Sequence, residues 1–321
     1  MEGGSHMGFE ALLGNERLKE TLTASLNKGH ISHFYVISGP KGSGKHTLAK
    51  LLTAAILCQG QHKPCGSCGP CRKLQNNNHP DFITVEDPEH KNVAVKIVRD
   101  IREDVFIRPN ESAYKVYLFP QELGIEGQNA LLKILEEPPA HGVFILLTDN
   151  PEKLLTTVRS RCTELKLRSL PEKLLHRQLK GDFPQLSEED IRSAMFRSGG
   201  FYGQAREILA EGGALPPQTE GFVRSFCARD SLGLTQVLVP LEKWKRDALA
   251  ELLGQWQQLL EQALACRTGS AAASAPARAM AQSRSSGEIL AALKQIAKAL
   301  EYCGSNVSTA AICGWLQWAL R

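Results

Sequence analysis

Two short stretches of this 321-residue chain carry residue types that could do chemistry. One is GPKGSGKHT, residues 39–47, which follows the apolar run 34–37 and precedes a helical pattern. A glycine-rich turn between a strand and a helix directs backbone N–H groups at phosphate oxygens, and its lysine reaches the outer phosphates. The sequence therefore predicts a phosphate-binding loop, whose candidate nucleotide-binding residues are Gly39, Gly42, Gly44, Lys45 and Thr47.

Two departures from the usual pattern of such a loop argue against a working ATPase. The residue after the lysine is normally Ser or Thr, whose hydroxyl helps to hold Mg²⁺, but here it is His46. Imidazole is a poor ligand for Mg²⁺, and Thr47 points about 100° away around the helix. An acidic pair is expected after the strand KVYLF, 115–119, but the sequence PQE, 120–122, follows. A nucleotide fold that has lost hydrolysis is predicted, with binding of ATP or ADP left open.

The second stretch is a cluster of four cysteines, Cys58, Cys65, Cys68 and Cys71. Two C-x-x-C steps and one upstream thiolate can converge on a tetrahedral ion, and four cysteines form a common structural zinc site without an open position. The sequence therefore predicts structural Zn²⁺ bound by these four residues. Two alternatives are an iron–sulfur cluster, whose motif normally ends in Cys-Pro, and a zinc site that His62 or His79 completes in place of Cys58.

The elements that must position these residues alternate along the first half of the chain. Apolar runs predict strands at 34–37, 82–85, 116–119 and 143–147, and an alternating pattern predicts a last strand at 163–167. Helical periodicity covers 48–57, 93–105 and 129–137. Strands separated by helices imply a parallel sheet with crossover helices on its faces. The predicted fold class is therefore α/β, with the four-cysteine module inserted at about 58–80.

After residue 170 the strand signals stop and the pattern becomes helical. The predicted division is an α/β domain over 8–168, a small helical domain over 169–212 and a larger all-helical domain over 213–321. The stretch 267–288 is low in large apolar residues and is predicted to be a mobile loop between two helices. Residues 1–7 are typical of a cloning remnant and are excluded from these predictions.

Composition excludes several classes of protein. The hydrophobic fraction of 42%, the charged fraction of 22% and the net charge of +4 are ordinary for a globular protein, and give no strong general attraction to nucleic acid. No apolar run approaches the roughly 20 residues that span a bilayer, and no signal peptide is visible. Five further cysteines scattered singly fit reduced thiols, so a cytoplasmic location is predicted.

The order of the motifs resembles one known family. The phosphate loop, the four-cysteine insertion, the motif NALLKILEEPP (129–139) and the motif SRC (160–162) together resemble the bacterial clamp-loader branch of the AAA+ ATPases. The resemblance implies an AAA+ nucleotide-binding fold over 8–168, a lid domain over 169–212 and a collar domain for oligomerisation over 213–321. The amphipathic pattern of 129–137 predicts a helix that packs against the sheet. Asn129 and Lys133 on this helix are candidate interface residues.

The resemblance also implies a role for Arg161, the arginine of the SRC motif. In clamp loaders this arginine reaches across a subunit interface to the ATP of a neighbour, where it stabilises charge on the phosphoryl group. His46 and the missing acids favour the delta-prime branch of the family over the ATP-hydrolysing gamma/tau branch. The implied function is a non-hydrolysing scaffold subunit of the DNA polymerase III holoenzyme, with gamma/tau and delta subunits, the sliding clamp and primed DNA as partners.

Two other functions are kept as alternatives. The chain could be an ATPase in its own right, with Thr47 and Glu122 as atypical ligands. It could also be a zinc-containing DNA-binding module with a vestigial nucleotide fold. ATP turnover by the isolated chain distinguishes the first alternative, and salt-dependent DNA affinity without partners distinguishes the second.

Overall fold

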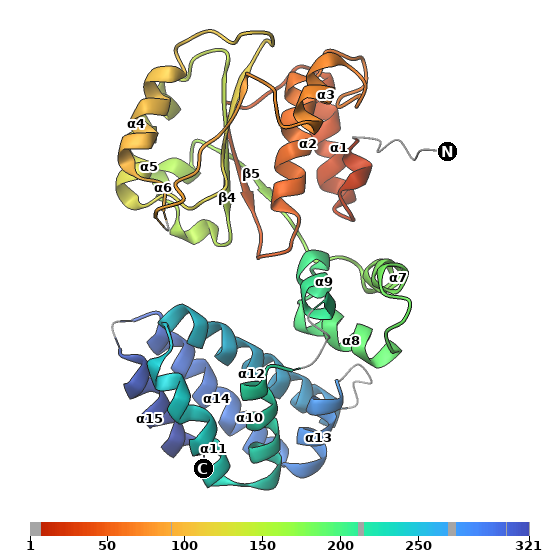
Figure 1. Ribbon diagram of the computed structural model, residues 1–321, viewed down its shortest axis with the longest axis vertical. Helices are drawn as coiled ribbons and strands as arrows, with labels where there is room; N and C mark the ends of the chain where they lie inside the picture. The colour runs from red at the N-terminus through yellow and green to blue at the C-terminus, as the bar shows by residue number, and fades with distance from the viewer. Residues whose placement is uncertain (1–7, 91, 211–214, 269–273, 306, 321) are drawn as a thin grey trace. The chain divides into compact units, whose positions relative to one another are not determined.

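A computed structural model describes residues 8–90, 92–210, 215–268, 274–305 and 307–320 (Figure 1). The predicted cloning remnant, residues 1–7, lies outside this set. The chain divides into two compact units, the first reaching Leu174 and including Phe201–Gln204, and the second formed by Leu175–Gly200 and the residues from Ala205 onward. Each unit is described separately below, and the division into three domains stays a prediction.

The first unit is built on a five-stranded parallel sheet in the order β2-β3-β4-β1-β5. Every residue of β1, β3 and β4 is buried, which explains why the central strands read as continuous apolar runs. The strands are β1 (Phe34–Ser38), β2 (Phe82–Thr84), β3 (Lys115–Phe119), β4 (Gly142–Thr148) and β5 (Thr163–Lys166). The predicted α/β class and parallel sheet are confirmed.

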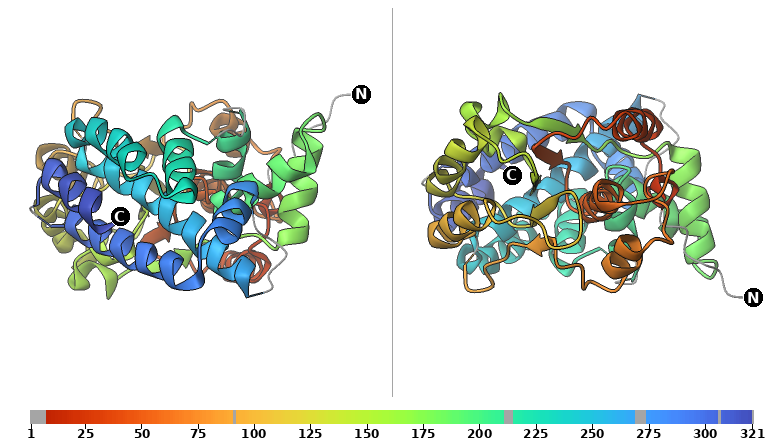
Figure 2. Two further views of the ribbon diagram at one scale, coloured as in Figure 1. Left: turned by 90° about the horizontal axis from the view of Figure 1, so that it is seen from below. Right: turned by 90° about the horizontal axis from the view of Figure 1, so that it is seen from above.

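Helices cover both faces of this sheet, as Figures 1 and 2 show. One face carries α1 (Glu16–Asn27), α2 (Lys45–Leu57) and α3 (Gly69–Gln75), and the other carries α4 (Val95–Asp104), α5 (Ile125–Glu136) and α6 (Thr156–Arg159). Side chains of β1 alternate accordingly, with Tyr35 and Ile37 in the first core and Phe34 and Val36 in the second. Short 3₁₀ turns lie at Phe9–Ala11 and Pro151–Lys153. Sequence periodicity missed α1, α3 and the short α6, and α5 begins four residues before its predicted start.

A partly buried polar cluster ties α4 to the sheet. The carboxylate of Asp104 accepts a hydrogen bond from the hydroxyl of Tyr117 and pairs with the ammonium of Lys115, both at 2.7 Å. The side chain of Lys115 is only 6% exposed, so its charge depends on this partner. Burial alone would raise the pKa of Asp104, but the bonds from Lys115 and Tyr117 outweigh it and lower that pKa.

Replacing Asp104 by alanine should therefore destabilise the first unit by about 2 kcal/mol, because a buried ammonium and a buried hydroxyl lose their partner. Hydrogen exchange of the β3 amides should accelerate by about 30-fold, the equivalent of 2 kcal/mol. Asp100→Ala, on an exposed position of the same helix, should leave exchange within a factor of about two. Equal exchange in the two variants would show that the ion pair contributes nothing.

All regular secondary structure in the described residues of the second unit is helical. Its helices are α7 (Glu172–Asp182), α8 (Glu188–Arg197), α9 (Tyr202–Ala210), α10 (Pro217–Ala228), α11 (Ser231–Leu238), α12 (Arg246–Arg267), α13 (Ala275–Ser283), α14 (Ser286–Cys303) and α15 (Thr309–Ala319), with a 3₁₀ turn at Val239–Lys243; α7 and α9 begin in residues assigned to the first unit. The core centres on Trp256, which stacks on Phe222 at 4.1 Å and donates to the hydroxyl of Thr219 at 3.2 Å. Within the described part of the chain, no helix combines the length and apolar character needed to cross a bilayer.

The predicted loop at 267–288 is wrong over most of its length. Helix α13 occupies Ala275–Ser283, and α14 begins at Ser286 with a reciprocal cap between Ser285 and Glu288. The helix α13 forms because Ala277, Met280 and Ala281 have the spacing of one helix face and are buried in the core. Alanine is the best helix former, so a lack of large apolar residues does not imply a loop. Residues 269–273 of this segment lie outside the described set.

Candidate functional site

The predicted phosphate loop lies between β1 and α2, with Lys45 as the first residue of the helix. Gly42 and Gly44 have φ of 73° and 96°, a left-handed conformation that favours glycine. Gly42 also admits a close neighbour, because a Cβ there would lie 2.2 Å from the backbone nitrogen of Gln204. The backbone N–H of Gly203 donates to the carbonyl of Gly42 at 3.0 Å. The structure thus brings the predicted glycines and lysine into one strand–turn–helix loop.

The ammonium of Lys45 is surrounded by acceptors from its own chain. It donates to the carbonyl oxygens of Gly39 at 2.5 Å and Pro40 at 3.0 Å, and to the carboxylate of Asp149 at 2.5 Å. An ammonium has three N–H donors, so these three acceptors engage all of them. The lysine is buried, whereas the side chain of Asp149 is 61% exposed.

Sequence reasoning missed Asp149, because the signal for it depends on which strands are neighbours in the sheet. Asp149 is the first residue after β4, and β4 is paired in parallel with β1, whose end leads into the phosphate loop. Because the carboxyl ends of neighbouring parallel strands meet at one edge of a sheet, an acid that ends β4 lies close to the loop. The pairing of these two strands is the information that the sequence pattern lacked.

The two residues after Lys45 lie on the exposed first turn of α2. Partial burial, followed by the positive charge of Lys45, lowers the pKa of His46 below its ordinary value. The imidazole is therefore mainly neutral at neutral pH, and it presents a nitrogen where Mg²⁺ would need an oxygen. The hydroxyl on this turn belongs to Thr47. Successive residues of a helix point about 100° apart, so Thr47 faces away from the side of the helix that the usual Ser or Thr would occupy.

The end of β3 holds an amide where an acid would be needed. Gln121 accepts a hydrogen bond from the backbone N–H of Asp87 at 2.6 Å and donates to the carbonyl oxygens of Asp87 and His90. Its side chain therefore fixes the chain between β2 and α4. The neighbouring Glu122 forms an ion pair with Lys153 at 3.0 Å. Both polar side chains after β3 are thus engaged away from the phosphate loop.

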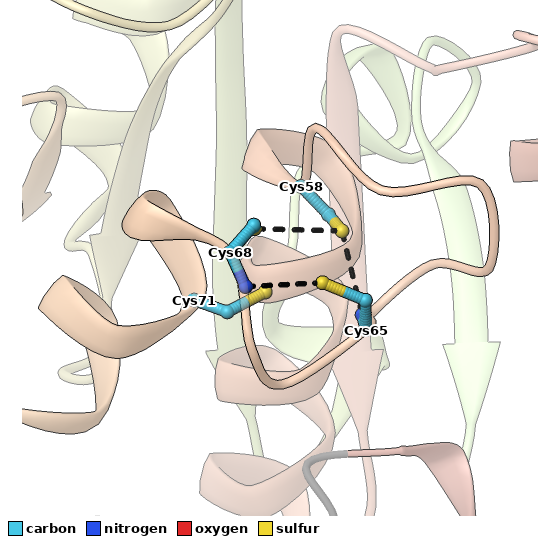
Figure 3. A group of neighbouring side chains, drawn as sticks. All are labelled: Cys58, Cys65, Cys68 and Cys71. Atoms are coloured by element: carbon cyan, nitrogen blue, oxygen red, sulfur yellow. Dashed lines mark hydrogen bonds between the residues drawn. The ribbon is translucent and has the colours of Figure 1, made fainter.

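The four cysteines of the predicted metal site converge at the end of α2 and the start of α3 (Figure 3). Their sulfur atoms all lie within 4.8 Å of one another. In a tetrahedral site with Zn–S bonds of about 2.3 Å the sulfur atoms are about 3.8 Å apart. The distances between the sulfur atoms are therefore close to those around a single bound metal ion, and the cluster could bind an ion such as zinc.

Backbone N–H groups point at two of the four sulfurs, as they would at the thiolates that a metal requires. The backbone N–H groups of Gly60 and Cys65 donate to the sulfur of Cys58 at 3.3 and 3.4 Å, and the N–H of Cys68 donates to Cys65 at 3.3 Å. Hydrogen bonds from the N–H of Ser67 and then of Cys68 lower the pKa of Cys65 to about 6 despite some burial. Burial instead raises the pKa of Cys58 and that of Cys71, and a bound cation would reverse both shifts.

The two histidines considered as alternative ligands lie outside this cluster. His79 accepts from the N–H of Asp81 at 3.1 Å through Nδ1, and its Nε2 lies 3.3 Å from the hydroxyl of Ser112. His62 is exposed. Both ring nitrogens of His79 are therefore engaged in the fold, and among the described residues only the four cysteines form a group that could hold an ion.

The SRC motif follows helix α6 directly. Arg161 is exposed; its guanidinium donates to the carbonyl of Thr157 at 3.1 Å and pairs with Glu136 at 3.5 Å. Arg159 pairs with Glu152 at 2.8 Å. Because an exposed pair of this kind is worth about 0–1 kcal/mol, Arg161 can exchange Glu136 for another anion at small cost.

Helix α5 sets the position of α6 and hence of the motif. The buried amide of Gln128 on α5 accepts from the backbone N–H of Leu155 at 2.7 Å and donates to the carbonyls of Leu123 and Lys153. Leu155 is the residue that precedes α6. The motif NALLKILEEPP thus belongs to a helix that packs against the sheet, as its amphipathic pattern predicts, and also holds the SRC turn.

The fold and the loop together define a class: a parallel sheet whose first strand passes through a glycine-rich turn into a helix is a phosphate-loop nucleotide-binding fold. Residues 14–171 match the family described as DNA polymerase III, delta subunit. The α/β part of this chain is therefore similar to the DNA polymerase III delta-subunit family and, among curated proteins, to gamma and tau subunits.

Curated relatives are similar over the same part of the chain. DNA polymerase III subunit tau of Bacillus subtilis is 39% identical over 158 residues, which are 48% of this chain and 28% of the relative. Subunit gamma/tau of Mycobacterium bovis is 34% identical over 209 residues, 63% of this chain and 36% of the relative. The chain thus spans about a third of the length of these relatives. These relatives are named tau or gamma/tau subunits, so the match does not show whether this chain belongs to the delta-prime branch.

Solved structures show weaker likeness. A DNA polymerase III gamma subunit-related protein of Thermotoga maritima shares 16% identity with a TM-score of 0.40, covering 94% of this chain and 99% of that one. The Bacillus subtilis DNA clamp loader delta protein shares 12% identity with a TM-score of 0.33, covering 94% and 98%. At these TM-scores the assignment of the fold rests on the sheet and the family match alone.

Proposed function

We propose that this chain is a non-hydrolysing scaffold subunit of a DNA polymerase III clamp loader, of the delta-prime type. The family match over 14–171 supports the clamp-loader assignment. The C-terminal helical region would assemble with gamma/tau and delta subunits, and the complex would place the sliding clamp on primed DNA in the cytoplasm. The polymerase holoenzyme, rather than this chain, would then supply the catalytic activity.

One observation carries the non-hydrolysing part of the proposal: neither of the two positions that hold Mg²⁺ in such a site carries its usual ligand. His46 stands where a hydroxyl should hold Mg²⁺, and the amide of Gln121 is engaged with Asp87 and His90 where a carboxylate should lie. Phosphoryl transfer depends on such ligands because the metal neutralises charge on the phosphates and positions them. A loop without these ligands has the backbone shape of a nucleotide site but lacks the groups that would hold the metal ion beside the phosphates.

Arg161 is proposed as the arginine that acts in trans on a neighbouring subunit's ATP. Its exposure and its weak pairing with Glu136 support this role, because the guanidinium can turn outward at small energetic cost. Arg159 is engaged with Glu152 at the shorter distance of 2.8 Å. We therefore assign Arg161, and not Arg159, to the neighbouring active site.

The four-cysteine cluster is proposed to hold structural Zn²⁺. Four thiolates leave a tetrahedral ion no open position for substrate or water, so the ion would fold the module rather than catalyse a reaction. A single ion is favoured over an iron–sulfur cluster, since iron atoms and bridging sulfides would have to fit within the same compact cage.

The alternative of an independent ATPase has less support. Glu122, its proposed acid, pairs with Lys153 instead of facing the loop, and Thr47 lies beyond the usual hydroxyl position. ATP turnover separates the two functions directly. The isolated chain should release no phosphate above background, whereas a complex reconstituted with gamma/tau and delta subunits should hydrolyse ATP. Robust turnover by the isolated chain that survives Lys45→Ala would point to contamination, and turnover abolished by Lys45→Ala would overturn the proposal.

A further inference from the structure

The phosphate loop carries its own counter-ion in this structure. Lys45 is 8% exposed, and a buried ammonium requires an anionic partner or strong acceptors. Asp149 supplies the charge at 2.5 Å, and the carbonyls of Gly39 and Pro40 supply the other two acceptors. The N–H donors that they engage are the ones that the outer phosphates of a nucleotide would need.

The loop backbone is also closed on itself. The N–H of Ser43 donates to the carbonyl of Pro40 at 3.1 Å, inside the turn whose N–H groups would otherwise face a phosphate. The hydroxyl of Ser43 is buried without a hydrogen-bond partner among the described residues. An unsatisfied buried hydroxyl costs about 1–3 kcal/mol, so the closed turn retains an unused polar group that a ligand oxygen could satisfy.

The position of Asp149 makes it an obstacle as well as a partner. It extends from the end of β4 beside the end of β1, the edge of the sheet at which ligands of such folds bind. Phosphate oxygens arriving at Lys45 would meet a carboxylate of the same sign. Binding would therefore require Lys45 to exchange Asp149 for phosphate and leave two like charges close together.

We propose that Asp149 is the specificity-determining residue of this loop, an internal anion that occupies Lys45 and excludes nucleoside di- and triphosphates. This inference rests on the proposed function, since it supplies a reason why the subunit carries a phosphate loop without using it. It extends that function by separating nucleotide exclusion, caused by Asp149, from the absence of hydrolysis, caused by His46 and Gln121. Asp149 does not act on any substrate; it acts through Lys45.

The exclusion can be tested on the full-length chain with MgADP, titrated by isothermal calorimetry. Asp149→Asn keeps the size of the side chain and a hydrogen-bond acceptor for Lys45 but removes the charge, so ADP affinity should rise at least about tenfold over wild type, the equivalent of about 1.4 kcal/mol. The ADP affinity of Asp149→Ala should rise as well. Glu152→Gln, the same change of charge three residues later at a side chain paired with Arg159, should match wild type.

A second substitution assigns the effect to the lysine. Asp149→Asn combined with Lys45→Ala should return ADP affinity to the wild-type level, because the freed ammonium is the group that the phosphates use. Wild-type affinity in both Asp149 variants, or a gain that persists without Lys45, would overturn the inference. Phosphate release measured on the same samples tests the proposed function separately: turnover by the wild-type chain contradicts that function, whereas unchanged ADP affinity contradicts only the role of Asp149.

Discussion

Replacing Arg161 by alanine should lower ATP turnover at least about 10³-fold at the neighbouring site to which the proposed function assigns this residue. An arginine supplied across an interface stabilises charge on the transferring phosphoryl group, and its contribution to kcat is about 10³–10⁵-fold. The measurement is steady-state phosphate release by a complex reconstituted with gamma/tau and delta subunits. The other sites of the complex would keep their own arginines. Single-turnover kinetics should therefore show a reduced amplitude of the fast phase of phosphate release.

Two matched variants separate this role from a structural one. Arg159→Ala removes the neighbouring guanidinium, which pairs with Glu152, and should leave turnover within about twofold. Arg161→Lys keeps the charge but loses the planar fork, so it should recover only part of the activity. Gel filtration of each complex verifies that assembly is unchanged. Equal turnover by the wild-type complex and by an intact complex that carries Arg161→Ala would remove the trans role from the proposed function.

Replacing Cys68 by serine should lower zinc affinity by more than about 100-fold and unfold the module locally, because one of four thiolate ligands is lost. Cys68 is the residue that precedes α3, and Cys71 lies inside this seven-residue helix. Such a short helix is not stable by itself in water, so its order would depend on the proposed ion and on packing of Leu74. The wild-type chain should contain one zinc per chain by elemental analysis, and Cys68→Ser should contain much less.

Hydrogen exchange locates the damage and provides the control. Amides of α3 should lose protection in Cys68→Ser and after treatment of the wild type with a chelator, whereas amides of β3 should keep theirs. Cys266→Ser, a cysteine on α12 far along the chain, should retain full zinc content. Iron with visible absorbance in place of zinc would support the iron–sulfur alternative. Loss of zinc in His79→Ala, with full retention in Cys58→Ser, would support the mixed ligand set.

The sequence predicted the parts of the site that are local along the chain. The phosphate loop needs glycine where φ is positive, and Gly42 and Gly44 occupy those positions. The cysteine cluster needs close spacing, and its four members lie within the short segment 58–71. Four strands followed from apolar runs, since the central ones are buried on both faces, and the edge strand β5 followed from its alternating pattern. Short-range geometry and burial are encoded in residue type, so these predictions needed no knowledge of the fold.

The predictions that failed or were never made depend on contacts between distant segments. Nothing local to residues 275–283 indicates a helix as strongly as the core against which Ala277 and Met280 pack. Likewise, the composition around Asp149 does not reveal its partner, because Lys45 lies 104 residues earlier in the chain. The sequence by itself determined the loop, the cysteine cage and the strands. Only the tertiary structure, by pairing β4 with β1, decided that the lysine of the loop faces a carboxylate of its own chain, because strand order depends on the packing of the whole sheet.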